Sequence, residues 1–166
     1  MILDTIAQAT RQRVAYAKEQ TPLMQLRLAA EKLPVTNSFR FEEALRTPGF
    51  SFVCEVKKAS PSKGVIAPEF PYLDIAKSYE RAGAAAVSVL TEPEFFLGSN
   101  LYLQKIRQQI SLPILRKDFT IDPYQIYEAK LLGADCVLLI CALLDTPMLR
   151  EYIELSDSLG MSALVE

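Results

Sequence analysis

Apolar residues along this chain alternate between short continuous runs and longer runs with helical spacing. Short runs rich in valine, leucine and isoleucine predict buried strands, at residues 52–57, 86–91, 113–118, 135–141 and 162–166. Runs with apolar residues three or four apart predict helices between these strands, at residues 73–82, 100–109, 123–132 and 146–159. Strand and helix in regular alternation predict right-handed βαβ crossovers and a parallel sheet.

A glycine at a helix end precedes three of the predicted strands, at Gly83, Gly133 and Gly160, and Pro113 opens another. This is the turn chemistry of a repeated βα unit. A Rossmann fold is the weaker choice because no G-x-G-x-x-G motif follows the first strand. A (β/α)8 TIM barrel fits better, but a full barrel has eight units in about 250 residues. The 166 residues here contain five units, so we expect an α/β fold of the TIM-barrel class, as a truncated barrel.

The segment before the first strand has a helical pattern throughout. We expect three helices, at residues 2–19, from Pro22 to about Pro34, and at 38–46. Asp4 or Thr5 is the expected cap of the first helix. The sequence therefore predicts an N-terminal helical extension at residues 1–48 and a partial barrel at residues 49–166.

The composition excludes several classes of chemistry. The chain has no histidine, which rules out Ser-His-Asp, Cys-His and histidine–metal sites within it. Acid–base work would fall to Lys, Glu, Asp, Tyr or Cys, and we expect neither metal nor cofactor. A net charge of −2 gives no basic surface for nucleic acid. No apolar run approaches the roughly 18 residues that span a bilayer, so we expect no membrane partner.

The three cysteines, Cys54, Cys136 and Cys141, all fall in apolar, strand-like runs. Their odd number and placement predict reduced, buried thiols rather than disulfides. The N-terminus carries charge early and lacks the apolar core of a signal peptide. We therefore expect a cytoplasmic enzyme or binding domain.

Charged residues interrupt the first predicted strand, which reads FVCEVK. Glu55 and Lys57 are two apart, so both point to the same face, just before the turn-forming stretch SPSKG. Charges at the carboxyl end of a buried strand are typical of an α/β active site. The alternative is an edge strand that carries an ordinary, solvated Glu/Lys pair.

Two further strands favour an active site over a solvated Glu/Lys pair. Lys117 ends the third strand and Glu166 ends the fifth, and alternate strands of a barrel contribute to the same interior layer. We expect Glu55, Lys57, Lys117 and Glu166 to converge on one pocket mouth, where they could donate or accept protons. A lysine can also form a Schiff base, so aldolase-type chemistry stays open.

Aromatic residues follow two of the strands. Phe95 and Phe96 lie in the second βα loop and Phe119 in the third. Aromatic rings at a barrel mouth suit a flat, apolar substrate. Plain packing under a loop is the alternative, and for Phe95 it is equally good.

Four blocks of sequence resemble indole-3-glycerol phosphate synthase of the tryptophan pathway. They are CEVKKASPSKG, SVLTEPEFFLGS, PILRKDFTIDPYQIYEAKLLGADCVLLI and GMSALVE, in order from about Phe52 to the last residue. The N-terminal helical segment also resembles the extension that this family adds to its barrel. The resemblance implies a lyase, a carboxy-lyase without cofactor or metal. Its substrate would be a small sugar phosphate, 1-(2-carboxyphenylamino)-1-deoxyribulose 5-phosphate, which is closed to indole-3-glycerol phosphate with loss of carbon dioxide and water.

The resemblance also assigns roles. It implies that Lys117 is the general acid at the ribulose carbonyl and that Glu166 serves the later dehydration. It further implies that Lys57 holds anionic groups of the substrate and that Glu55 orients the lysines. The implied substrate-binding residues are Ser60, Phe96, Phe119 and Leu138.

The end of the chain departs from the family pattern. The family's further catalytic asparagine and serine and its phosphate loops lie on strands six to eight, whereas Glu166 is the last residue here. We therefore expect little or no synthase activity from this chain alone. Two other functions stay open: another sugar-phosphate barrel enzyme, and a non-catalytic fragment that self-associates through exposed sheet edges.

Overall fold

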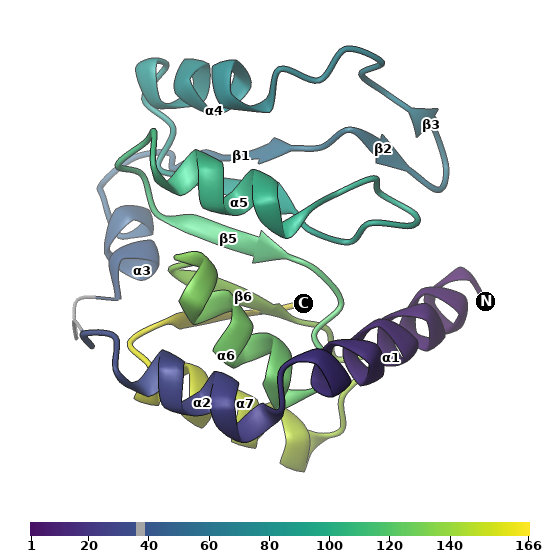
Figure 1. Ribbon diagram of the computed structural model, residues 1–166. Helices are drawn as coiled ribbons and strands as arrows, with labels where there is room; N and C mark the ends of the chain where they lie inside the picture. Colours follow the sequence, from purple (N-terminus) through teal and green to yellow (C-terminus); the bar gives the residue numbers. More distant parts are fainter. Residues whose placement is uncertain (36–38) are drawn as a thin grey trace.

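The computed structural model describes residues 1–35 and 39–166. Its main feature is a five-stranded sheet in the order β1-β4-β5-β6-β7, with every pairing parallel. The strands are β1 (Val53–Val56), β4 (Ala86–Leu90), β5 (Ile114–Lys117), β6 (Cys136–Leu139) and β7 (Ser162–Val165). All five lie within the ranges predicted from the sequence. Their carboxyl ends point toward α1 (Ile2–Gln20), on the right of Figure 1.

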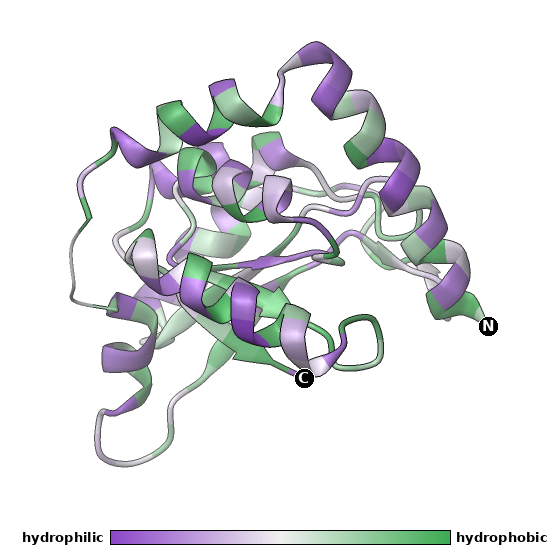
Figure 2. Ribbon diagram, turned by 90° about the horizontal axis from the view of Figure 1, so that it is seen from below, coloured by the Kyte–Doolittle hydropathy of each residue, from purple (hydrophilic) through white to green (hydrophobic). Residues whose placement is uncertain are grey.

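Four helices connect these strands and pack on one face of the sheet. They are α4 (Tyr72–Arg81), α5 (Asn100–Arg107), α6 (Pro123–Leu132) and α7 (Thr146–Ser158), each within two residues of its predicted bounds. Apolar side chains on alternate strand positions fill the layer between sheet and helices, among them Val87, Ile114, Val137 and Leu139. Figure 2 shows these strands as a mostly hydrophobic centre surrounded by helices of mixed character.

The opposite face of the sheet carries a smaller apolar cluster. It consists of Ala86, Leu115, Cys136 and Leu138, with Phe41 from α3 (Arg40–Leu45) packed against them. Helix α3 lies at the amino ends of the strands (Figure 1). The sheet is therefore covered by helices on one face, whereas α3 closes only the amino end of the other.

The N-terminal helices share the main core. Val14 of α1, together with Leu26 and Ala30 of α2 (Leu23–Glu31), joins the apolar cluster between helices and sheet. The expected cap of α1 is wrong, because the helix begins at Ile2 and Asp4 lies inside its first turn. The predicted start of α3 at residue 38 lies outside the described residues, and the domain boundary at residue 48 stays a prediction.

The prediction that the first strand is buried is wrong for its first residues. Phe52 is 66% exposed and Val53 is 41% exposed. Among the described residues β1 pairs only with β4 in this sheet, so it is an edge strand. Leu164 and Val165 are likewise 38% and 45% exposed on β7, the other edge.

The segment after β1 contains a short hairpin, where the sequence predicts only a turn. Strand β2 (Ala59–Ser60) pairs with β3 (Gly64–Val65) in antiparallel fashion. Gly64 adopts a φ of 63°, a conformation that glycine reaches without a steric penalty. The backbone N–H of Ile66 donates to the carbonyl of Lys58 at 2.8 Å and closes the hairpin.

The cysteines are free, as predicted, but they are not all buried. Cys136 is buried, Cys54 is partly exposed and Cys141 is exposed. Burial raises the pKa of the Cys136 thiol to about 12. Cys141 is exposed because it follows β6 in a loop instead of extending the strand.

No helix in the described part of the chain is both long and apolar enough to cross a membrane.

Candidate active site

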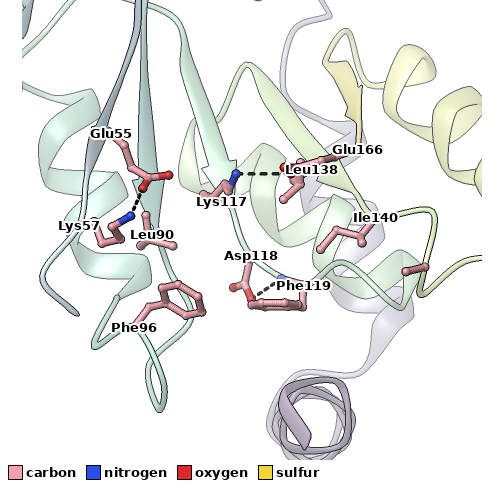
Figure 3. A pocket seen from close by; sticks show the side chains of 11 residues that line it. Glu55, Lys57, Leu90, Phe96, Lys117, Asp118, Phe119, Leu138, Ile140 and Glu166 are labelled. Carbon is pink, nitrogen blue, oxygen red and sulfur yellow. Dashed lines mark hydrogen bonds and ion pairs between the residues drawn. The ribbon is translucent and has the colours of Figure 1, made fainter. Parts of the chain in front are cut away.

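A pocket of about 520 Å³ opens at the carboxyl ends of the strands (Figure 3). This volume lies in the range of sites for small molecules. Its lining consists of Glu55, Lys57, Leu90, Phe96, Lys117, Asp118, Phe119, Leu138, Ile140, Ala142 and Glu166. The four charged residues singled out from the sequence therefore all line one pocket, with apolar side chains between them.

The charged residues form two ion pairs on opposite sides of the pocket. Lys57 Nζ lies 2.7 Å from Glu55 Oε1, and Lys117 Nζ lies 3.5 Å from Glu166 Oε2. Both lysine side chains are about one-third exposed, at 33% and 30%, whereas Glu166 is 63% exposed. Each lysine therefore has a carboxylate at hand and still faces the open pocket.

Strand alternation explains why these side chains meet. Lys117 lies next to Leu90 in the β4–β5 register, and both side chains line the pocket. Leu138 lines it from β6, two positions beyond Cys136 on the inward face. Arg116, one position before Lys117, is buried and points to the helix side. The period of two thus sorts one face toward the pocket and the other toward the helices.

Phe96 and Phe119 form the aromatic side of the pocket. Their ring centroids are 5.9 Å apart and their planes are tilted by 40°. The buried carboxylate of Glu92 shapes the loop before Phe96, because it accepts N–H groups from residues 94, 95 and 96 at 2.7–3.0 Å. Phe95 is not among the residues that line this pocket.

Gly98 fits tightly at the end of that loop. A Cβ atom there would lie 2.5 Å from the backbone oxygen of Leu90. Glycine therefore lets the loop return close to β4, which brings Phe96 over the strand ends.

Ser60 does not line this pocket. It lines a neighbouring hollow of about 540 Å³ between the β2–β3 hairpin and the start of α1. Lys57 and Phe96 border both spaces. The Ser60 hydroxyl accepts the N–H of Lys63 at 3.3 Å, so it orders the hairpin turn and stands beside, not in, the main pocket.

Sequence reasoning missed a buried polar group in the wall of the pocket. Asp118 accepts hydrogen bonds from Arg13 of α1 at 2.7 and 3.0 Å and from Thr91 at 2.6 Å. Burial by itself would raise the pKa of Asp118, but the guanidiniums of Arg13 and Arg116 outweigh it and hold this pKa below the usual value. The only signal in the sequence was a carboxylate directly after Lys117; nothing in it points to Arg13.

Within the described residues, no group of three or more His, Cys, Asp or Glu side chains is arranged to hold a metal ion.

Comparison with known proteins identifies the family. The family model for indole-3-glycerol phosphate synthase matches residues 3–166. The chain belongs to the indole-3-glycerol phosphate synthase family. This confirms the resemblance drawn from the four sequence blocks, and with it the TIM-barrel class of the parallel sheet.

Curated relatives that carry this name match the chain over its whole length. A protein of Ruminiclostridium cellulolyticum is 60% identical over 166 residues, one of Endomicrobium trichonymphae 54%, and one of Lacticaseibacillus paracasei 52%. In each case the match covers 100% of this chain and 64% of the relative. The chain thus spans just under two-thirds of the length of these synthases.

Proposed function

We propose that this chain carries the strand-one to strand-five part of an indole-3-glycerol phosphate synthase. The reaction would close 1-(2-carboxyphenylamino)-1-deoxyribulose 5-phosphate to indole-3-glycerol phosphate, with loss of carbon dioxide and water. The observation that carries the proposal is the pocket itself, in which two lysine–carboxylate pairs flank an apolar and aromatic wall. An aryl ring would pack on that wall, and the charged groups would serve the anionic and hydroxyl groups of the sugar phosphate.

The proposed roles follow from where each group stands. Lys117 protonates the ribulose carbonyl oxygen as the aromatic carbon attacks, and Glu166, 3.5 Å away, serves the later dehydration. Lys57 binds anionic substrate groups, and Glu55, 2.7 Å away, orients it. The protons move between side chains and substrate, so these steps call for no cofactor or metal.

Phe96, Phe119 and Leu138 would hold the anthranilate ring, since all three line the pocket. Ser60 would contact the substrate only if part of the substrate extends into the neighbouring hollow, which Lys57 and Phe96 also border.

A chimera tests this proposal in a complete barrel. The present residues 1–166 are joined to the part of the Ruminiclostridium cellulolyticum relative that follows its matched region, since the two are 60% identical over the match. We expect the chimera to form fluorescent indole-3-glycerol phosphate from the substrate, with the intact relative as positive control. A folded chimera without turnover would contradict the proposed function.

A second sugar-phosphate chemistry remains open because both lysines face the pocket. An aldolase-type enzyme would form a Schiff base on Lys57 or Lys117. Borohydride added during turnover would then trap a covalent adduct on one of them, whereas the synthase leaves both lysines unmodified.

Taken alone, these 166 residues are expected to have little or no synthase activity, because they span only 64% of the length of the matched synthases and the Glu166 carboxylate is 63% exposed. Turnover close to that of the intact relative would show otherwise.

We also propose that the chain alone self-associates. Phe52 and Val53 are exposed on one sheet edge, and Leu164 and Val165 on the other, and unpaired strand edges invite pairing. Light scattering that reports a monomer at high concentration would refute this. We place the protein in the cytoplasm, where free cysteines such as these three stay reduced; recovery from another cell fraction would count against it.

A further inference from the structure

A buried set of polar side chains lies around Asp118, in the wall of the pocket. Asp118, the residue after Lys117, is only 2% exposed. Arg13 of α1 grips both of its carboxylate oxygens, with Nη1–Oδ2 at 3.0 Å and Nη2–Oδ1 at 2.7 Å. The backbone N–H of Phe119 donates to the same carboxylate at 2.8 Å, and the hydroxyl of Thr91 donates at 2.6 Å. In Figure 3, α1 is seen end-on below Phe119.

The residue before Lys117 is fixed equally well, on the other face of β5. Arg116 donates from Nε to the Thr91 hydroxyl at 3.1 Å and from Nη1 to the carbonyl of Gln125 at 2.8 Å. Its Nη2 donates to Asn100 at 3.0 Å and also pairs with Glu128. Thr91 therefore links the side chains that stand on either side of Lys117.

We propose that Arg13 and Asp118 are positioning residues that hold the carboxyl end of β5, so that Lys117 and Phe119 keep their places in the pocket. The proposal rests on the proposed function for its meaning, because it concerns the lysine assigned as general acid. Arg13 lies 105 residues before Asp118. The N-terminal helix thus takes part in building the site, although α1 supplies no residue to the lining of the main pocket.

We expect the Arg13–Asp118 pair to position neighbouring residues more than to stabilise the fold. A buried charge pair stabilises a fold little, because desolvation offsets most of the attraction, and apolar residues of similar size often do as well. A two-point contact between a guanidinium and a carboxylate does, however, fix direction as well as distance. Catalytic groups need such fixed geometry, since a displacement of about 1 Å can cost on the order of a hundredfold in rate.

Two substitutions separate these roles. Asp118→Asn keeps the shape of the side chain and removes its charge, and Arg13→Lys keeps the charge and removes the two-point contact. Arg13 is partly exposed, with a side chain 28% accessible, so Arg13→Lys remains informative where Asp118→Asn fails to fold. The matched control is Lys18→Gln, which breaks the 2.6 Å pair between α1 and Asp122 on the same loop without touching Asp118.

The readout is local and does not depend on turnover. Lysines of the chain are methylated with ¹³C-formaldehyde, and the Lys117 signal is assigned with Lys117→Arg; phenylalanines carry a fluorine label, and Phe119 is assigned with Phe119→Tyr. We expect Asp118→Asn and Arg13→Lys to shift the signals of Lys117 and Phe119, while that of Lys105, on the exposed side of α5, stays in place. Lys18→Gln should leave all three unchanged.

Unchanged Lys117 and Phe119 signals in both variants, with only the unfolding free energy lowered, would overturn the proposal. Equal shifts in Lys18→Gln would overturn it too, because general docking of α1 would then explain them. In an active chimera we expect Arg13→Lys to lower kcat/KM by about tenfold to a hundredfold. A chimera without turnover would count against the proposed function alone, since the signals of the chain still decide the positioning role.

Discussion

The two lysines of the pocket stand at equivalent strand ends but have different surroundings. In β5, Lys117 is preceded by the buried Arg116 and followed by the buried Asp118, both tied into one hydrogen-bonded set. At the end of β1, Lys57 is preceded by the buried, apolar Val56 and followed by the partly exposed Lys58, which leads into the β2–β3 hairpin.

This difference indicates two ways to hold a charged group. The apolar packing of Val56 keeps the strand against the core next to Lys57 but provides no directional contact. The hydrogen bonds of the residues on both sides of Lys117, in contrast, fix the orientation of the backbone there. The partners differ accordingly: Glu55 lies on β1, two residues before Lys57, whereas Glu166 lies beyond the end of β7 and is separated from β5 by β6. We infer that Lys117 is preorganised for proton transfer and that Lys57 serves binding.

The largest effect is expected from Lys117→Gln in the chimera. Removal of the proposed general acid should lower kcat by about 10²–10⁴-fold. Lys57→Gln should instead act mainly on KM, because the proposed anion contact of Lys57 would be present both before and during the reaction. Initial rates across substrate concentrations separate the two constants, and Lys105→Gln on the exposed side of α5 serves as a control without effect. A kcat loss of the same size in both lysine variants would remove the distinction drawn between the strand ends.

The next largest effect is expected on the unfolding free energy, which substitutions at the ends of β5 and β1 should lower by different amounts. Arg116→Met leaves Glu128 without its buried partner and weakens the set around Asp118. Loss of one member of a buried ion pair costs on the order of 3–5 kcal/mol. Val56→Ala, at the matching position of β1, should cost about 1–3 kcal/mol, mainly through lost apolar contact. Urea unfolding of each variant measures both values, and a larger loss for Val56→Ala would reverse the comparison.

Much of this difference lies beyond the reach of local sequence patterns. The five strands and the four helices between them could be predicted, because valine- and leucine-rich runs and helical spacing are local properties. The inward aim of Glu55, Lys57 and Lys117 could also be predicted, because alternation in a strand has a period of two.

The features that could not be predicted depend mostly on residues distant in the sequence. Nothing near Arg13 in the sequence indicates that it meets Asp118, since the contact depends on how α1 packs across the loops. The exposure of Phe52 and Val53 depends on which strands lie beside β1, not on their own apolar character. The β2–β3 hairpin was missed because strands of two residues are too short to show a period.

Acid should weaken the β5 end through Asp118. The pKa of Asp118 is lowered in the folded state, while an unfolded aspartate has a pKa of about 3.9. The unfolded chain therefore binds the proton more readily, and the stability that Asp118 contributes is full above about pH 3.9 and is lost as the pH falls through the lower folded pKa. Urea unfolding between about pH 5 and pH 2.5 should show this loss. In Asp118→Asn the unfolding free energy should fall less steeply with decreasing pH. An equally steep fall would assign the acid sensitivity to other carboxylates.

The smallest effect is expected from Tyr79, whose side chain forms a hydrogen bond with the backbone of β1 next to the Glu55–Lys57 ion pair. The Tyr79 hydroxyl donates to the carbonyl of Glu55 at 3.1 Å, and burial raises the pKa of that hydroxyl, so it stays protonated as a donor at neutral pH. Tyr79→Phe removes this one bond and keeps the ring, which should cost about 0.5–1.5 kcal/mol in the unfolding free energy. Because the bond holds the backbone of Glu55 and not the side chain of Lys57, we expect the KM of the chimera to change by less than in Lys57→Gln. A KM as high as that of Lys57→Gln would mean that the end of β1, like that of β5, depends on a directional contact, and the contrast between the two strand ends would fail.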